Sequence, residues 1–162
     1  MTLTQGQLQT LKNDILADAT LNAFPNNSDG NLEIAAAYDQ QAAPAFTVWK
    51  TRVSITQIGD NIVGSELSGL SSLNSTRLQT VVVLSADGVN PSLPDRRAFF
   101  DDIFSGAGGT ATRAKLLILW KRLATRVEKL FATGTGSDAV PATMAFEGPL
   151  DPRDVLKARE LP

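Results

Sequence analysis

The sequence has 162 residues, of which 43% are hydrophobic and 20% charged, and it contains neither His nor Cys. This length and composition predict one ordinary soluble domain that can bury a core without disulfide or metal cross-links. The two missing residue types exclude a Ser-His-Asp triad, a Cys nucleophile, His or thiolate metal ligands, and disulfides.

The charges are unevenly distributed along the chain. The formal net charge is -2, but residues 1–110 carry 6 basic and 11 acidic residues, whereas residues 111–162 carry 9 basic and 6 acidic ones. Such polarity is typical of a protein that docks head to tail, or of one with a basic face near nucleic acid. A solvated basic helix is the alternative. No stretch resembles a secretory signal or a membrane span.

The first predicted helix begins after Thr4, which together with Gln7 has the spacing of a capping box. It ends before Pro25, because the residue preceding a proline disfavours the helical conformation. Its apolar side chains recur at helical spacing: Leu8, Leu11, Ile15 and Leu16.

The next segments are less regular. A second helix is expected from about Ser28 or Asp29 to Gln41, and residues 45–53 fit either a strand or a helical continuation. Ser54 and Gln57 repeat the capping-box spacing and predict a short helix. The glycines that follow indicate a flexible stretch over residues 59–72, with Gly64–Ser65 as the expected bend.

Three more helices are predicted in the second half of the chain. The first spans about residues 73–85, and its inward-facing residues are expected to be Leu73, Leu78, Val81, Val82 and Leu84. The second begins at Pro94 and ends near Gly106. The third begins at Thr110 or Thr112 and is expected to continue to Phe131, with one apolar and one basic stripe.

The segment after Gly134 is predicted to be an extended arm. Residues 142–147 alternate weakly and suggest one strand, and Pro152 begins a short terminal helix. The resulting fold class is mainly α: a helical bundle of about five helices with an extended C-terminal arm. The expected division is a bundle domain over residues 1–133 and an arm over residues 134–162.

Several local motifs have both a functional and a structural interpretation. The glycine-rich segment 106–110 precedes a helix and can hold phosphate, but it lacks the phosphate-loop spacing, so a linker is favoured. The pair Asp101–Asp102 suits a metal or acid–base site, although a solvated helix face is the commoner explanation. Trp49 and Trp120 suit interface anchors or, preferably, the core.

Basic residues are the best candidates for partner contacts. Arg96 and Arg97 are one such pair, and the stripe of the long helix is the other: Lys115, Arg122, Arg126 and Lys129. They fit DNA phosphates contacted without base reading, or an acidic surface of a protein partner. A helix-turn-helix reader fits less well, because the basic helix also carries a wide apolar stripe.

Two blocks of sequence resemble a known protein family. Residues 124–136 lead into residues 141–148, and with the upstream segment 44–50 they are similar to small proteins encoded among the virion structural genes of tailed bacteriophages and prophages. The resemblance implies a virion component, most like a head-to-tail adaptor that forms a ring beneath the portal. No catalytic, cofactor or metal residue is implied.

The resemblance also implies partners and a location. The expected partners are the portal and tail proteins, neighbouring copies in the ring and DNA in the channel, in a virion assembled in the bacterial cytoplasm. We expect the arm to bind the portal or a neighbouring copy through five residues: Pro141, Met144, Phe146, Val155 and Leu156. A capsid decoration protein, another minor virion protein and a small DNA-binding accessory protein are the alternatives, and an enzyme is not expected.

Overall fold

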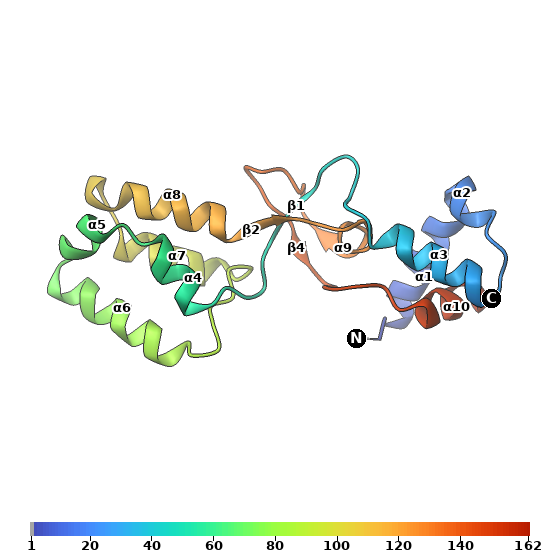
Figure 1. Cartoon of the computed structure of the whole chain (residues 1–162), viewed down its shortest axis with the longest axis horizontal. Helices are drawn as coiled ribbons and strands as arrows, with labels where there is room; N and C mark the ends of the chain where they lie inside the picture. The colour runs from blue at the N-terminus through green and yellow to red at the C-terminus, as the bar shows by residue number, and fades with distance from the viewer. Residues whose placement is uncertain (1) are drawn as a thin grey trace. The chain divides into compact units, whose positions relative to one another are not determined.

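The computed structural model describes residues 2–162, which are mainly helical as the sequence predicts (Figure 1). In that range there are ten α-helices, one 3-10 helix (Ala107–Gly109) and four short strands. The α-helices are α1 (Gln5–Ala17), α2 (Ala19–Asn22), α3 (Ser28–Tyr38), α4 (Ile55–Asn61), α5 (Gly64–Ser68), α6 (Ser72–Leu84), α7 (Pro94–Ile103), α8 (Thr110–Leu119), α9 (Arg126–Phe131) and α10 (Pro152–Glu160). The strands are β1 (Thr47–Trp49), β2 (Lys121–Leu123), β3 (Ala132–Thr133) and β4 (Thr143–Met144).

The chain divides into two units. Unit 1 consists of Met1–Val48 and Leu123–Pro162, and unit 2 of Trp49–Arg122. The two passages between the units fall within β1 and β2, which pair with each other. The boundary expected after residue 133 coincides with neither passage, and residues 134–162 belong to unit 1 together with the first three helices.

Unit 1 is built around α1, α3 and α10. The capping box predicted at Thr4 is present, since its side chain accepts from the Gln7 amide while the Gln7 side chain accepts from the Thr4 amide. Helix α10 packs against both α1 and α3, as Figure 1 shows for the red and blue helices. The core side chains come from all parts of this unit and include Leu11, Ile15, Ile34, Tyr38, Val127, Phe131, Phe146, Val155 and Ala158.

The C-terminal segment contains the short strand and the short terminal helix that the sequence predicts, as β4 and α10, and it packs on the rest of unit 1. Strands β3 and β4 form an antiparallel pair, with Ala132 opposite Met144 and Thr133 opposite Thr143. The following helix buries Val155 and Ala158 completely. These residues are three apart and share one helix face, so the helix docks on α1 and α3 and buries apolar area that an extended arm would expose.

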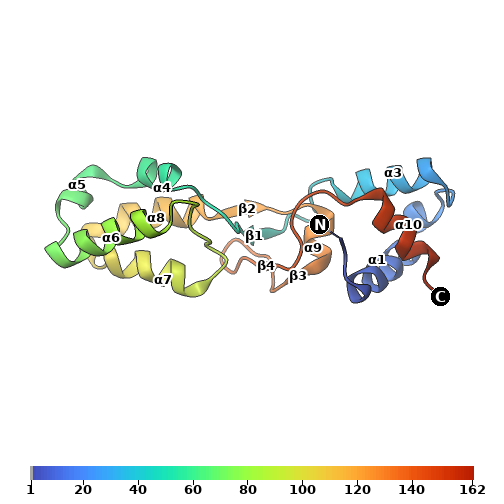
Figure 2. The same ribbon diagram turned by 90° about the horizontal axis from the view of Figure 1, so that it is seen from below.

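Unit 2 has its own core. Helix α4 packs against α8, and α6 packs against α7 (Figure 2). Phe100 and Trp120 meet edge to face with ring centroids 5.6 Å apart, so Trp120 is a core residue as preferred from the sequence. The second predicted capping box is also present, with Ser54 capping α4 and Gln57 returning the bond.

Helix α6 has the expected position but not the expected burial. Leu78 and Val81 are buried, whereas Leu73, Val82 and Leu84 are exposed, which corrects the inward face predicted for this helix. Among the described residues, α6 makes its main contact with α7, so one narrow stripe is enough to fill that contact. The expected flexible bend at Gly64–Ser65 is instead the first turn of α5.

The long helix predicted up to Phe131 is wrong. Helix α8 ends at Leu119, β2 pairs with β1, and α9 begins after Thr125. Thr125 forms a third capping box with Glu128, and Gly148 donates its amide to the other Glu128 carboxylate oxygen at 3.3 Å. Because Glu128 is buried, this cap fixes the helix start within the core of unit 1.

The packing of α10 can be tested with two adjacent residues. Val155→Ala should lower the free energy of unfolding by about 1–3 kcal/mol, because it leaves a cavity in the core. Leu156→Ala should change it by less than about 0.5 kcal/mol, since that side chain is 37% exposed. Urea unfolding followed by circular dichroism measures both, and equal effects would show that α10 does not pack as described.

Candidate functional site

The four cations predicted to form one stripe lie on three different elements. Lys115 is exposed on α8 and Arg122 is in β2, both in unit 2, whereas Arg126 and Lys129 are on α9 in unit 1. Since α8 and α9 are separate helices, the continuous basic stripe does not exist. Arg126 and Lys129 line a common hollow.

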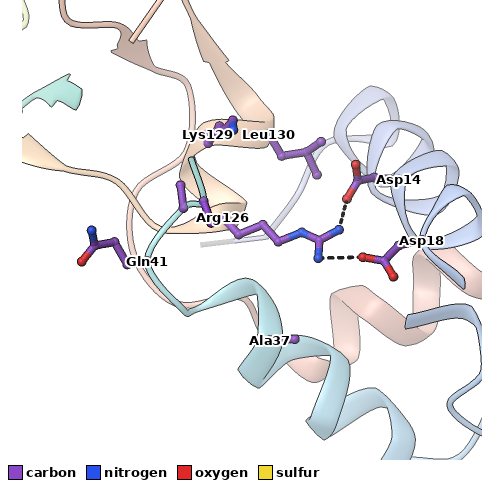
Figure 3. A pocket seen from close by; sticks show the side chains of 9 residues that line it. Asp14, Asp18, Ala37, Gln41, Arg126, Lys129 and Leu130 are labelled. Atoms are coloured by element: carbon purple, nitrogen blue, oxygen red, sulfur yellow. Dashed lines mark hydrogen bonds and ion pairs between the residues drawn. The ribbon is translucent and has the colours of Figure 1, made fainter. Parts of the chain in front are cut away.

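That hollow is the candidate site. It has a volume of about 710 Å³ and lies within unit 1, between α1, α3 and α9 (Figure 3). Its charged lining comes from α1, the residue that follows it, and α9. The lining residues are Asp14, Asp18, Ala37, Gln41, Ala42, Ala43, Arg126, Lys129 and Leu130.

Arg126 is the central residue of the site. It occupies the first turn of α9, and Figure 3 shows its side chain crossing the hollow toward α1. One guanidinium nitrogen donates to Asp14 Oδ2 at 3.0 Å and another donates to Asp18 Oδ2 at 2.9 Å. The guanidinium also lies 4.7 Å from the centre of the Tyr38 ring. Arg126 therefore ties α9 to α1 and α3.

Asp18 has two separate tasks. Its Oδ1 accepts the amides of Thr20 and Leu21, at 2.9 and 3.2 Å, and so caps α2. Its Oδ2 accepts from Arg126. The hydrogen bond from Arg126 and the backbone amides together hold the pKa of Asp18 below its usual value. Asp18 therefore remains ionised at all but acidic pH.

The second carboxylate of the site, Asp14, accepts hydrogen bonds from both Arg126 and Tyr38. Asp14 Oδ2 also accepts from the Tyr38 hydroxyl at 2.5 Å. Burial and this hydrogen bond raise the pKa of the Tyr38 phenol far above its usual range, so it stays protonated and donating. Burial alone would lower the pKa of Arg126, but the hydrogen bonds to Asp14 and Asp18 outweigh it and the pKa is raised.

These contacts define what the site can do. Both carboxylates and the guanidinium are committed to each other, so their arrangement is suited to holding three helices together. Lys129 lies at the edge, with its ammonium 5.7 Å from the Phe46 ring centre. Across residues 2–162, no cluster of three or more Asp or Glu side chains is placed to hold a metal ion.

Sequence reasoning missed this network because it placed Arg126 inside a long helix. The signal that could have found it is the Thr125-x-x-Glu128 spacing, which is the capping-box pattern recognised at Thr4 and Ser54. A cap at Thr125 puts Arg126 in a first turn. The spacing of Asp14 and Asp18, one helical turn apart, would then have suggested a partner for it.

The backbone amides that follow the glycine-rich segment, at the start of α8, bind a carboxylate of the chain itself. The Glu66 carboxylate of α5 accepts the backbone amides of Ala111 and Thr112 at 3.0 and 2.7 Å. Hydrogen bonds from Thr112, and from the amide of Ala111, hold the pKa of Glu66 below its usual range. The helix terminus that the sequence offered to phosphate therefore binds this chain's own carboxylate.

The other predicted residues of unit 2 lie on or next to α7. Arg97 stacks over Trp49, with its guanidinium carbon 3.9 Å from the ring centre, while Arg96 is exposed. Asp101 and Asp102 are both exposed, and the partial desolvation of the Asp101 carboxylate, together with repulsion from Asp102, raises the pKa of Asp101. Arg97 and Asp101, one member of each pair, therefore line one hollow together with Trp49.

The five residues expected to bind a partner through the arm have different surroundings. Pro141, Phe146 and Val155 are buried within unit 1, Met144 is half-buried in β4, and Leu156 is exposed on α10. Phe146 packs edge to face on Phe131, with centroids 5.8 Å apart. Three of the five residues therefore support the fold of unit 1, and Leu156 is the most accessible to a partner.

Removing the central cation should destabilise unit 1. Arg126→Ala leaves two carboxylates without their shared partner, so we expect the free energy of unfolding to fall by about 1–2 kcal/mol. Arg153→Ala is the matched control, because its ion pair with Asp151 is largely exposed and should contribute little. Urea unfolding measures both. An Arg126→Ala protein as stable as the control would show that the network does not hold the helices.

The same network predicts a pH dependence. The lowered pKa of Asp18 means that its stabilising effect is present above the unfolded pKa and is lost as pH falls through the folded value. The stability difference between the wild type and Arg126→Ala should therefore shrink as pH is lowered from about 5 to about 3. Unfolding curves at several pH values measure it, and a constant difference would contradict the role of Asp18.

Comparisons with protein-family models, with curated proteins and with solved structures found no match. Of the helices described for residues 2–162, none combines the length and the apolar character that crossing a bilayer requires. The family resemblance expected from residues 124–136, 141–148 and 44–50 therefore stays a prediction.

Proposed function

We propose that this chain is a structural subunit of a phage virion, a head-to-tail adaptor that forms a ring beneath the portal. The observation that carries the proposal is the opposite charge of its two units. Unit 1 contains 6 Lys and Arg against 11 Asp and Glu, and unit 2 contains 9 against 6. A subunit that must contact an identical neighbour through two different surfaces benefits from such complementarity.

Exposed apolar side chains on unit 2 support a role in assembly. On α6, Leu73, Val83 and Leu84 are 66%, 75% and 79% exposed. Single exposed apolar residues are ordinary, but with Val82, which is 40% exposed, this helix of 13 residues carries four large ones, which indicates a surface that a protein partner covers. We assign this surface to the portal or tail proteins, and the accessible Leu156 of unit 1 remains a further contact.

The roles of the basic residues follow from their positions. Arg126 serves the internal network, while Lys115 on α8 is exposed in the more basic unit. Because the four cations do not share one helix, a continuous track for duplex DNA is not favoured. We therefore propose that the cations of unit 2 bind an acidic surface of a protein partner.

Binding to the portal tests the proposal directly. The chain should co-sediment with the portal protein encoded in the same genome, saturably and at a fixed ratio. Replacing Val83 and Leu84 by Glu should weaken this binding about tenfold or more, because it places charges in an apolar contact. Val140→Glu, an exposed apolar residue of unit 1, is the control and should bind like the wild type.

Binding assays with the portal protein, the major capsid protein and duplex DNA separate the alternatives. No association with the portal at any ratio would reject the adaptor role. Binding to the major capsid protein instead would indicate a decoration or other minor virion protein. Steeply salt-dependent binding of the isolated chain to duplex DNA, without portal binding, would indicate the accessory DNA-binding role.

A further inference from the structure

Helix α8 presents an outer face that nothing in its own unit covers. Thr112 and Leu116 are buried on the inner side, whereas Ala111, Ala114 and Lys115 are exposed. Ile118 continues this face and is 72% exposed. The four outer residues lie three, four and seven positions apart, so they form one continuous ridge with a cation in the middle.

Helix α3 presents a matching face in unit 1. Ile34, Ala35 and Tyr38 point into the core, which leaves four residues at the same three, four and seven spacing on the outer side. These outer residues are Asp29, Leu32, Glu33 and Ala36, and all are exposed. Leu32 is 57% exposed, and two carboxylates lie beside it.

We propose that the outer face of α8 in one copy binds the outer face of α3 in a second copy. The inference rests on the proposed ring and names the contact that builds it. With the two helices antiparallel, Glu33 lies beside Lys115 on one side of the contact, Leu32 lies beside Ala114 on the other, and Ala36 faces Ala111. The large Leu32 then meets a small side chain and two alanines meet each other, which allows close packing of the two helices.

Charge selects this pairing over self-pairing. Two α8 faces would bring Lys115 toward its own copy, and two α3 faces would bring together Asp29 and Glu33, so each symmetric contact is repulsive. Neither Glu33 nor Lys115 has an ion-pair partner among residues 2–162, so both charges are available to a neighbour. The α3–α8 contact is therefore heterologous, the type from which rings are built when the rotation between successive copies closes.

The lack of Cys in the chain permits a clean cross-linking test. Ala36→Cys and Ala114→Cys are introduced together, and the protein is treated with a short bismaleimide, whose reach suits side chains of helices about 8–10 Å apart. We expect a ladder of dimers, trimers and larger species on a denaturing gel. The matched control carries Ala36→Cys together with Ala98→Cys. Ala98 is exposed on α7, in the same unit as Ala114 but outside the proposed contact, so this variant should remain monomeric.

Mixing and charge reversal make the test specific. The two single variants should stay monomeric alone and give only dimers when mixed. In the double-Cys background, Lys115→Glu should reduce the cross-linked yield about fivefold or more, and adding Glu33→Lys should restore it. Recovery in the swapped pair would show that the two residues meet, rather than that either substitution damages the fold.

Each contrary result overturns the inference. Cross-linking of either single variant alone would show a symmetric contact, and a product confined to the monomer band would show a contact within one chain. A ladder equal to that of the control pair would show non-specific association. Loss of the α3–α8 ladder with portal co-sedimentation retained would reject this interface while leaving the adaptor role intact.

Discussion

The pairing of β1 with β2 is the constraint on which the rest of the molecule depends. Lys50 donates its amide to Trp120 at 2.8 Å, and Ala124 donates to Phe46 at 2.9 Å. A helix cannot continue through a segment whose backbone groups are bonded to another strand. The chain therefore leaves one unit and enters the other here, and Thr125 must begin a new helix.

The new helix start determines the electrostatics of unit 1. With Thr125 as the cap, Arg126 lies in a first turn and reaches Asp14 and Asp18. A cation at a helix start is unfavourable for the helix dipole. Its two short carboxylate contacts and its stacking on Tyr38 compensate, so the network is a tertiary feature that no local preference predicts.

The sequence predicted the helix starts that are formed by residues close together in the chain. The caps at Thr4 and Ser54 and the proline-led start of α7 were recognisable, because the groups that form each of them lie within a few residues. The hollow around Arg126 was not, because its partners are more than a hundred positions away. Periodicity also could not distinguish one long helix from α8, β2 and α9, since apolar residues recur through all three.

The distribution of charge is where sequence and structure combine into a functional argument. The sequence shows an acidic first part and a basic last part, but the structure assigns the charges to two units that do not follow that order. The basic unit is an insertion between the two segments of the acidic one. A chain arranged in this way carries both halves of a complementary pair. Two such chains gain attraction only when unlike units meet, because each like pairing is repulsive. Successive copies can satisfy that condition when each contact has the same direction, and such head-to-tail contacts generate either closed rings or open filaments.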